Sequence, residues 1–251
     1  MKQELFKIAA EAGEKILQSS GGNVENKEDG SPLTIADIAS HNHLCTALSK
    51  LKNIPILSEE DVQPYHERKN WDTFWMIDPL DGTKEFIAGL PDFCINISLM
   101  EKNKPIIGLI YAPILKEFYY AEKSKGFSYD GLSHPTAGSS QLVAAKSRFH
   151  NSEMTQSFLE ANKIKKSIQV GAAIKFGRLA LGEINIYPRF EGSKEWDIAA
   201  GHLILLEAGG QILDLNTKKP PKYNKKYMNN NFFISFSNSI SKKLDLYQML
   251  N

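Results

Sequence analysis

Cysteine is scarce in this sequence, with only Cys45 and Cys94 among 251 residues. Two cysteines are too few for a disulfide framework, so we expect a protein of a reducing compartment. An excess of one charge is also missing, because 30 Lys and Arg residues against 29 Asp and Glu residues give a formal net charge of +1. This balance argues against a bulk field that attracts nucleic acid or an anionic membrane. Any charged ligand must therefore be recognised by a local cluster.

Long apolar runs are absent as well. The longest, at residues 93–100 and 105–115, are well short of the roughly 20 residues that a membrane-spanning helix needs. The first residues lead into a helix interrupted by polar side chains, unlike the apolar segment of a signal peptide. With 42% hydrophobic residues, the composition is that of an ordinary globular protein with a large core. We expect a cytoplasmic protein without a transmembrane segment.

Apolar spacing predicts two helices followed by a sheet. Apolar residues recur at helical spacing over 5–17 and 35–48, and Thr34 with Asp37 three residues later is a variant of the capping box. From residue 54 the pattern changes to short apolar runs bounded by turns, which predicts strands, and the Asn103-Lys104 pair predicts a hairpin between two of them. The expected strands are 54–57, 74–77, 93–100, 105–111 and 117–121.

Turn-forming residues mark two interruptions. Residues 23–33 predict a loop, and residues 131–140 are the best candidate for a boundary between subdomains. Beyond that boundary strands alternate with helices, which predicts an α/β layered half. Its expected strands are 142–145, 168–170, 184–187, 211–213 and 232–236, and its helices lie near 151–162, 173–182 and 197–208. We therefore divide the chain into an α+β subdomain, 1–135, and an α/β subdomain, 136–251.

Acidic residues gather at the ends of two predicted strands. Segment 75–83 holds Asp78 and Asp81 three residues apart, and its proline and glycine can bend the chain so that both carboxylates and the Leu80 carbonyl converge. Such an oxygen-only environment suits Mg²⁺. Segment 59–61 adds three more acids after another strand. Each segment alone has a plainer interpretation, a Pro/Gly turn and a solvated acidic loop.

Three ordered motifs carry a family resemblance. They are Ser58-Glu59-Glu60-Asp61, the W-x-x-D-P-L-D-G-T run from Trp75 to Thr83, and Trp196-Asp197 with the helix that leads to Gly209-Gly210. In these motifs the chain resembles the inositol monophosphatase-like family of Mg²⁺-dependent, lithium-sensitive phosphatases. The resemblance covers nearly the whole chain. It implies a layered αβαβα sugar-phosphatase fold of two subdomains, with the metal site between them.

Further residues resemble the bisphosphate nucleotidase branch of that family. Lys84 and Glu85 stand where inositol phosphatases typically have threonine and asparagine, and segments 31–37 and 187–190 also match the nucleotidases. The resemblance implies hydrolysis of the 3'-phosphate of adenosine 3',5'-bisphosphate to AMP and phosphate, which clears a by-product of sulfate assimilation. An inositol or other sugar-phosphate phosphatase is the alternative. A regulatory nucleotide- or RNA-binding protein is the alternative of another class.

Carried over residue by residue, the resemblance implies two or more Mg²⁺ ions that neutralise the phosphate and activate a water. The implied metal ligands are Glu59, Asp78, the backbone carbonyl of Leu80, Asp81 and Asp197. Asp37 and Thr83 match the catalytic pair that orients and deprotonates the water. The residues alone leave plainer interpretations open, because Asp37 and Asp197 could simply be acids that stabilise the first turn of a helix.

The expected substrate contacts combine the metal motifs with basic residues. They are Glu59, Leu80, Asp81, Gly82, Thr83, Arg148, Gly171, Lys175 and Asp197. Segment 170–175 matches the family's substrate loop, where the Gly171 backbone approaches the nucleotide and Lys175 reaches a phosphate at the start of a helix. By composition alone, Lys175 would be a surface residue.

One departure from the family lies on this basic side. Relatives have a histidine where this chain has Arg148, with His150 two residues later. We therefore expect Arg148 to contact the phosphate or the base through its fork of donors. Arg189 is a second basic candidate, for which a structural salt bridge is the alternative.

The expected partner is thus a small molecule, adenosine 3',5'-bisphosphate, and not a nucleic acid. The basic cluster 218–226 is interpreted as a solvated loop, because no aromatic stacking pattern accompanies it. The expected location is cytoplasmic, with peripheral attachment to the cytoplasmic face of the inner membrane as an alternative taken from relatives. The sequence leaves the oligomeric state open.

Overall fold

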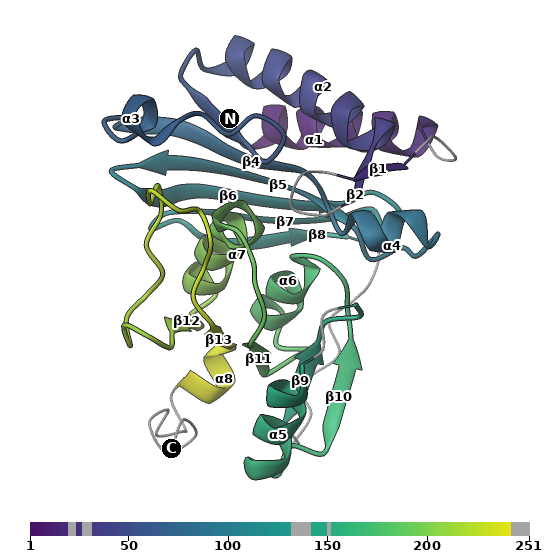
Figure 1. Cartoon of the computed structure of the whole chain (residues 1–251), viewed down its shortest axis with the longest axis vertical. Coiled ribbons are helices and arrows are strands. Elements are labelled where there is room, and N and C mark those ends of the chain that lie inside the picture. The colour runs from purple at the N-terminus through teal and green to yellow at the C-terminus, as the bar shows by residue number, and fades with distance from the viewer. Residues whose placement is uncertain (20–23, 27–31, 132–141, 150–151, 242–251) are drawn as a thin grey trace.

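Helices and sheets alternate in five layers (Figure 1). Helices α1 (Lys2–Gln18) and α2 (Ile35–Leu51) cover one face of a six-stranded sheet. Its other face meets α6 (Ile174–Ala180) and α7 (Glu195–Glu207), which also lie against a five-stranded sheet. Beyond that sheet lie α5 (Glu153–Ala161) and α8 (Asn238–Ser241). The computed structural model therefore confirms the predicted αβαβα fold.

The structure describes residues 1–19, 24–26, 32–131, 142–149 and 152–241. The predicted boundary at 131–140 falls almost wholly outside these residues, so the division at 135 stays a prediction. Within the described residues, no helix is long and apolar enough to cross a membrane.

The start of α2 follows the predicted capping box. The Thr34 hydroxyl accepts hydrogen bonds from the N–H groups of Ala36 at 3.2 Å and Asp37 at 3.4 Å. The Asp37 carboxylate accepts the N–H of Thr34 at 2.7 Å in return. Apolar side chains such as Leu5 of α1 and Leu44 of α2 are buried against the sheet. Both predicted N-terminal helices are confirmed.

The six-stranded sheet has the order β3-β4-β5-β6-β7-β8. Its strands are β3 (Ile56–Ser58), β4 (Thr73–Asp81), β5 (Cys94–Glu101), β6 (Lys104–Ala112), β7 (Glu117–Glu122) and β8 (Gly126–Asp130). β3 is parallel to β4 and the other pairs are antiparallel. The predicted hairpin joins β5 and β6, but its turn is Lys102-Asn103, with φ of 50° and 58°. Two left-handed residues give the twist that a two-residue hairpin needs, so the turn lies one residue earlier than predicted.

β4 carries the acidic motif on an irregular stretch of strand. Its pairing with β5 shifts register between Asp78 and Asp81. Gly82 follows with a φ of 93° and α4 (Thr83–Ile87) begins at once. The sequence places a turn directly after Asp78, whereas the strand continues to Asp81 through a bulge. A bulge re-aims side chains without ending the strand, so both carboxylates sit on a rigid element.

The five-stranded sheet has the order β10-β9-β11-β13-β12. Its strands are β9 (Val143–Lys146), β10 (Lys166–Gln169), β11 (Ile186–Arg189), β12 (Gln211–Asp214) and β13 (Phe233–Phe236). β9 runs parallel to β10 and β11, and β13 is antiparallel to β11 and β12. These strands and helices match the predicted alternation within a few residues.

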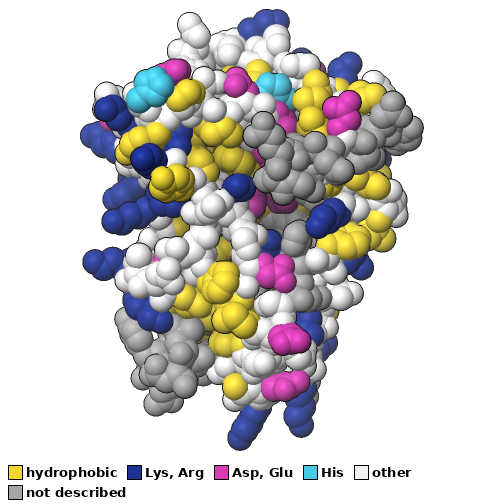
Figure 2. Space-filling view, in the orientation of Figure 1, with side chains coloured by type: hydrophobic (Ala, Val, Ile, Leu, Met, Phe, Trp, Pro, Cys, Tyr) yellow, Lys and Arg dark blue, Asp and Glu magenta, His cyan; other side chains and the backbone are white. Residues whose placement is uncertain are grey.

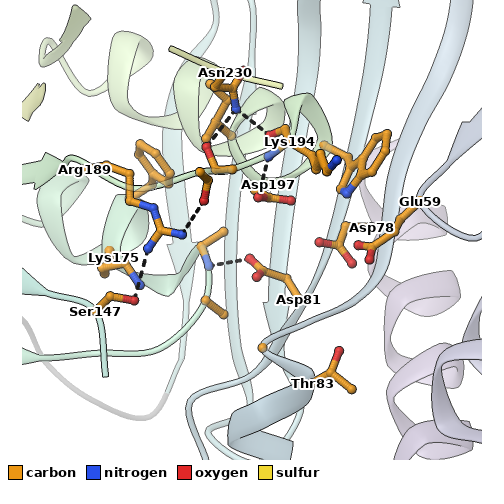
Figure 3. Close-up of a pocket in the computed structure, with 18 of the residues that line it drawn as sticks. Glu59, Asp78, Asp81, Thr83, Ser147, Lys175, Arg189, Lys194, Asp197 and Asn230 are labelled. Atoms are coloured by element: carbon orange, nitrogen blue, oxygen red, sulfur yellow. Dashed lines mark hydrogen bonds between the residues drawn. The ribbon is translucent and has the colours of Figure 1, made fainter. Parts of the chain in front are cut away.

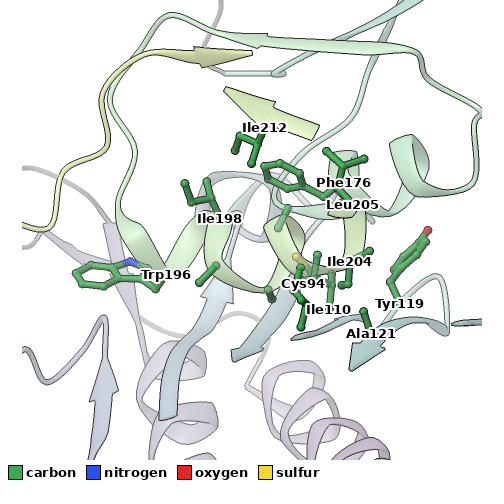
Figure 4. Close-up of a cluster of buried hydrophobic side chains, with 14 of the residues drawn as sticks. Cys94, Ile110, Tyr119, Ala121, Phe176, Trp196, Ile198, Ile204, Leu205 and Ile212 are labelled. Atoms are coloured by element: carbon green, nitrogen blue, oxygen red, sulfur yellow. The ribbon is translucent and has the colours of Figure 1, made fainter. Parts of the chain in front are cut away.

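Helix α7 packs closely on the six-stranded sheet. A Cβ on Gly108 of β6 would lie 2.6 Å from the Ala200 carbonyl oxygen, so only glycine allows this approach. Around α7, side chains from both sheets form one buried cluster, in which Cys94, Tyr119, Phe176 and Ile204 take part (Figure 4). The apolar core is therefore continuous across the predicted division.

Several short elements are absent from the sequence-based prediction. β8 follows β7, and α3 (Tyr65–Arg68) and α4 flank β4. β1 (Val24–Asn26) pairs with β2 (Pro32–Thr34), and the two strands occupy much of the described part of the predicted loop 23–33. Strands of three residues and helices of four or five are too short for a clear periodicity.

Candidate active site

Three carboxylates converge between one end of the six-stranded sheet and the start of α7. Glu59 follows β3, Asp78 lies in β4, and Asp197 lies in the first turn of α7. Their nearest carboxylate oxygens all lie within 4.8 Å of one another. Figure 3 shows the three side chains pointing toward a shared space. The structure thus brings together residues from three separate motifs of the sequence.

Burial makes this group of acids electrostatically costly. Asp78 is only 2% exposed. Burial, together with the charge of Glu59, raises the pKa of Asp78 well above its usual value. Burial, together with the charge of Asp81, likewise raises the pKa of Asp197. A divalent cation would remove this cost, and an all-carboxylate set of oxygen donors fits a hard cation. The residues present therefore suit a metal site.

Asp81 has a different set of partners. Its Oδ2 accepts hydrogen bonds from the N–H of Ala173 at 2.6 Å and from Asn96 Nδ2 at 3.1 Å. Burial raises its pKa too, and these hydrogen bonds act in the opposite direction. Its carboxylate is not among the three that converge within 4.8 Å. Asp81 lines the same cavity, and its role as a metal ligand stays a prediction.

Asp37 and Thr83 lie within hydrogen-bond distance of each other. Thr83 Oγ1 is 3.3 Å from Asp37 Oδ1 and 3.2 Å from the Leu80 carbonyl oxygen. The hydroxyl has one proton and can donate it to either acceptor. Asp37 is 1% exposed, and its Oδ2 is held by the backbone N–H and hydroxyl of Thr34. The capping role of Asp37 is confirmed, and its catalytic role stays a prediction.

Asp197 is predicted either as a metal ligand or as an acid that caps a helix, and its position is compatible with both. Its Oδ2 accepts the backbone N–H of Lys194 at 2.8 Å, which is a helix-capping contact. The same side chain belongs to the acidic group. Capping orients the carboxylate and leaves its other oxygen for a ligand.

Lys175 is buried, contrary to what composition predicts. It is 2% exposed, its ammonium donates to the Val170 carbonyl at 2.9 Å, and it lies 5.2 Å from the centre of the Tyr187 ring. Burial and the nearby Arg189 lower its pKa to about 8. A buried amine lining a cavity is a candidate for binding an anion.

Arg189 lines the cavity beside Lys175. Its Nη1 is 3.3 Å from Ser147 Oγ and its Nη2 donates to the Gly192 carbonyl at 2.8 Å. Its buried Nε has no hydrogen-bond partner, and among the described residues no carboxylate lies within ion-pair distance. The salt bridge considered as its alternative role is therefore not formed in the described part of the chain.

Arg148 and Gly171 are tied to Asp92. Arg148 forms an ion pair with the Asp92 carboxylate, which also accepts the N–H of Gly171 at 3.2 Å. A Cβ on Gly171 would lie 2.4 Å from the Asp92 carbonyl oxygen, so this approach requires glycine. Neither Arg148 nor Gly171 lines the cavity. Their contact with substrate stays a prediction, and His150 lies outside the described residues.

One cavity of about 680 Å³ joins these groups. Glu59, Asp78, Asp81 and Asp197 line one side, and Lys175 and Arg189 lie across from them (Figure 3). In Figure 2 acidic side chains are visible in a recess near the middle of the face, whereas most Lys and Arg side chains lie along the outline of the molecule. The cavity therefore has an acidic side and a basic side, although the positive and negative charges of the whole chain nearly cancel.

Known proteins resemble this chain over nearly its whole length. The sequence model of the inositol monophosphatase family matches residues 1–244. The chain belongs to the inositol monophosphatase family. Among its relatives, the 3'(2'),5'-bisphosphate nucleotidase CysQ of Salmonella typhimurium is 36% identical over 226 residues, which cover 87% of this chain and 92% of that protein.

Solved structures of the inositol monophosphatase family agree with this assignment. CysQ from Bacteroides thetaiotaomicron superposes with a TM-score of 0.82 at 33% identity, covering 94% of this chain and 97% of that one. An IMPase of Thermotoga maritima superposes with a TM-score of 0.80 at 25% identity, covering 98% and 94%. The inositol monophosphatase family is metal-dependent, which agrees with the convergence of acids in this member.

Some residues of the site carry no signal in the sequence. Asp92, Asn96 and Ser147 hold Gly171, Asp81 and Arg189 in place, as described above. Lys194 and Asn230 line the cavity. These five residues lie outside the family motifs, and only the folded chain brings them to the site or to the residues that form it.

Proposed function

We propose that this member of the inositol monophosphatase family is a 3'(2'),5'-bisphosphate nucleotidase. It would hydrolyse the 3'-phosphate of adenosine 3',5'-bisphosphate to AMP and phosphate. The observation that carries the proposal is a single cavity with an acidic side and a separate basic side. Relatives named 3'(2'),5'-bisphosphate nucleotidase support it, because they are 34–36% identical over most of the chain.

The acidic side is proposed to hold Mg²⁺. Glu59, Asp78 and Asp197 offer converging carboxylates, and the family resemblance adds Asp81 and the Leu80 carbonyl to the set of ligands. When bound, divalent cations of this kind offset the charge of a phosphate and lower the pKa of the attacking water. The buried carboxylates, with their raised pKa values, gain most from such a cation.

Asp37 and Thr83 are proposed to act on the attacking water. The Thr83 hydroxyl orients the water and passes a proton toward Asp37, whose position the Thr34 cap fixes. The water oxygen forms the new bond to phosphorus while the bond from phosphorus to the 3'-oxygen breaks, and the released 3'-oxygen takes up a proton from solvent to become the 3'-hydroxyl of AMP. Threonine is too weak a base alone, so the carboxylate is needed as the proton acceptor.

The basic side is proposed to hold the second phosphate. The Lys175 ammonium and the unpaired Nε of buried Arg189 lie on the cavity wall across from the acids. A buried donor without a partner is costly, and a phosphate oxygen would satisfy it. An inositol monophosphate has only one phosphate and would leave these donors unmatched.

Phosphate release tests the proposal. Purified protein with Mg²⁺ should release phosphate from adenosine 3',5'-bisphosphate much faster than from inositol 1-phosphate, and Asp78→Asn should abolish release. Faster release from inositol 1-phosphate would support the alternative sugar-phosphate activity. No release from either substrate would favour a protein that only binds nucleotides.

A second comparison tests the basic side. Lys175→Met and Arg189→Met should each raise KM for adenosine 3',5'-bisphosphate and leave KM for adenosine 3'-monophosphate nearly unchanged. Equal changes for both substrates would contradict the assignment.

The cytoplasmic location and the exclusion of nucleic acid as a partner stay part of this proposal.

A further inference from the structure

A buried arginine outside the cavity ties together the two segments that supply Glu59 and Asp197. Arg68, in α3, is 2% exposed and does not line the cavity. It follows Glu59 by nine residues in the sequence, whereas Asp197 lies in the other half of the chain. Between Arg68 and α7 runs segment 224–226.

Every nitrogen of the Arg68 guanidinium donates a hydrogen bond. Nη1 donates to Asn224 Oδ1 at 2.7 Å, and Nη2 lies 2.7 Å and 3.2 Å from the carbonyls of Lys225 and Lys226. Nε donates to the Gln63 carbonyl at 3.0 Å. The Asn224 amide returns a hydrogen bond to the Arg68 carbonyl at 2.9 Å. The fork of donors fixes both the position and the orientation of the segment.

Glu195 binds the same segment from the opposite side. Its side chain is completely buried, and its two oxygens accept the backbone N–H groups of Asn224 at 2.5 Å and Lys225 at 3.1 Å. Its Oε1 also pairs with the Lys225 ammonium at 2.6 Å. Segment 224–226 is thus held between two charged side chains. The Arg68 guanidinium binds the carbonyls of Lys225 and Lys226, and the Glu195 carboxylate binds the N–H groups of Asn224 and Lys225.

The contacts continue from Glu195 to the acidic group. Glu195 begins α7, two residues before Asp197, and its own N–H donates to the Met228 carbonyl at 3.0 Å. Asn230 donates to the Lys194 carbonyl, and the Lys194 N–H donates to Asp197 Oδ2 at 2.8 Å. The first turn of α7, which carries Asp197, is therefore anchored to segment 224–226 through the Glu195 side chain and to the residues that follow it through Met228 and Asn230.

Such an anchor has a physical purpose. Glu59 and Asp197 repel each other when both are ionised, and only a bound cation makes their approach favourable. If the two segments were free to separate, the repulsion would widen the site, and cation binding would have to reverse that movement. A buried network that holds the segments in place removes this penalty.

We propose that Arg68 is a positioning residue, which through segment 224–226 and Glu195 fixes the separation of Glu59 and Asp197 and so sets the affinity for a divalent cation. The inference rests on the proposed function only in taking these acids as cation ligands. It assigns no contact between Arg68 and the cation or the substrate.

Direct cation binding tests the proposal. Arg68→Gln should weaken Mn²⁺ binding, measured by calorimetry or by the electron paramagnetic resonance of free Mn²⁺, by at least about tenfold. The same variant should need a correspondingly higher Mg²⁺ concentration for half-maximal phosphate release, with kcat at saturating Mg²⁺ close to that of the wild type. Unchanged Mn²⁺ affinity would overturn the proposal.

Arg178→Gln is the matched control. Arg178 pairs with Glu117 at 2.8 Å and so is also a mostly buried arginine that joins α6 to the six-stranded sheet. It does not line the cavity. Its loss should destabilise the fold without altering Mn²⁺ affinity. If both arginine variants weakened Mn²⁺ binding equally, general destabilisation of the fold would explain the loss, and the proposal would be overturned.

Two further variants keep the test decisive if Arg68→Gln folds poorly. Arg68→Lys keeps the charge but loses the fork, and Asn224→Leu removes the side chain that exchanges hydrogen bonds with Arg68. Each should weaken Mn²⁺ binding, and their effects should be less than additive in the double variant because both act through one segment. Fully additive effects would contradict a shared path.

The outcomes for the proposed function are separate. If the wild type binds Mn²⁺ and Arg68→Gln weakens binding, but no bisphosphate is hydrolysed, the proposed function fails and the positioning role stands. If the wild type hydrolyses the bisphosphate and Arg68→Gln binds Mn²⁺ normally, only the positioning role fails. A wild type that binds no Mn²⁺ overturns both.

Discussion

The Thr83 hydroxyl lies 3.3 Å from one oxygen of Asp37, while the other oxygen of Asp37 is held by Thr34. Asp37 therefore has a structural contact and a candidate catalytic contact at the same time. The helix cap uses Oδ2 and leaves Oδ1 facing the hydroxyl. A fixed carboxylate beside a hydroxyl is the geometry that proton transfer requires.

Asp37→Asn should lower kcat for bisphosphate hydrolysis by about 10²–10⁴-fold, because the amide cannot accept the proton of the water. The amide oxygen can still accept the Thr34 N–H, so the melting temperature should change little. Thr34→Val is the control, because it removes the capping hydroxyl and should cost about 1 kcal/mol of stability while retaining most of kcat. Similar losses of kcat in both variants would point to a capping role alone.

The pH dependence of kcat/KM should report Lys175. Its pKa is lowered to about 8 by burial and by Arg189, so raising the pH above 8 removes the positive charge that would attract the second phosphate. We expect kcat/KM for adenosine 3',5'-bisphosphate to fall above about pH 8, mainly through a rise in KM. Lys175→Arg should keep KM low to higher pH, since arginine stays protonated. If kcat/KM for adenosine 3'-monophosphate fell above the same pH, the fall could not be assigned to the contact of Lys175 with the second phosphate.

Much of the site could be predicted from the sequence, because its carboxylates lie in short motifs at strand ends and match a family pattern. Glu59, Asp78 and Asp197 belong to three such motifs, and the structure brings their carboxylates together. The basic side could not be predicted equally well. By composition Lys175 would be a surface residue, but the folded chain buries it and places its ammonium over the Tyr187 ring.

The fold shows the same difference between local and distant information. The cap at Thr34 and the hairpin between β5 and β6 depend on neighbouring residues and were predictable. The bulge between Asp78 and Asp81 depends on pairing with β5, and the Asp92 contact of Arg148 joins residues 56 positions apart. Such pairings follow from tertiary structure and leave no periodicity in the sequence.

Gly108→Ala should destabilise the fold. The new methyl group would lie 2.6 Å from the Ala200 carbonyl oxygen, where β6 and α7 pack backbone to backbone. Neither backbone can yield freely, so we expect a loss of about 1–3 kcal/mol in the free energy of unfolding, measured in urea. Gly192→Ala is the control, because a Cβ there meets no atom within 4 Å and its φ is not positive. Equal stability of the two variants would show that α7 can shift to accommodate the methyl group.

His202 should make the protein less stable in acid. Burial lowers its pKa to about 4, and its Nδ1 lies 2.8 Å from the Tyr223 hydroxyl. Well above pH 6.5 this histidine is neutral in both the folded and the unfolded chain, so it adds no pH dependence there. Below pH 6.5 the unfolded chain binds the proton and the folded chain does not, which lowers the free energy of unfolding by about 2 kcal/mol at pH 5.

His202→Gln isolates this contribution, because glutamine can still hydrogen-bond Tyr223 but does not titrate. Urea unfolding of both proteins at pH 7.5 and pH 5 gives the difference directly, since the titration of all other groups is common to the two. The wild type should lose about 2 kcal/mol more than the variant on acidification. If the wild type and the variant lost the same free energy of unfolding on acidification, His202 would take up its proton in the folded state, through an opening of the contact between α7 and Tyr223.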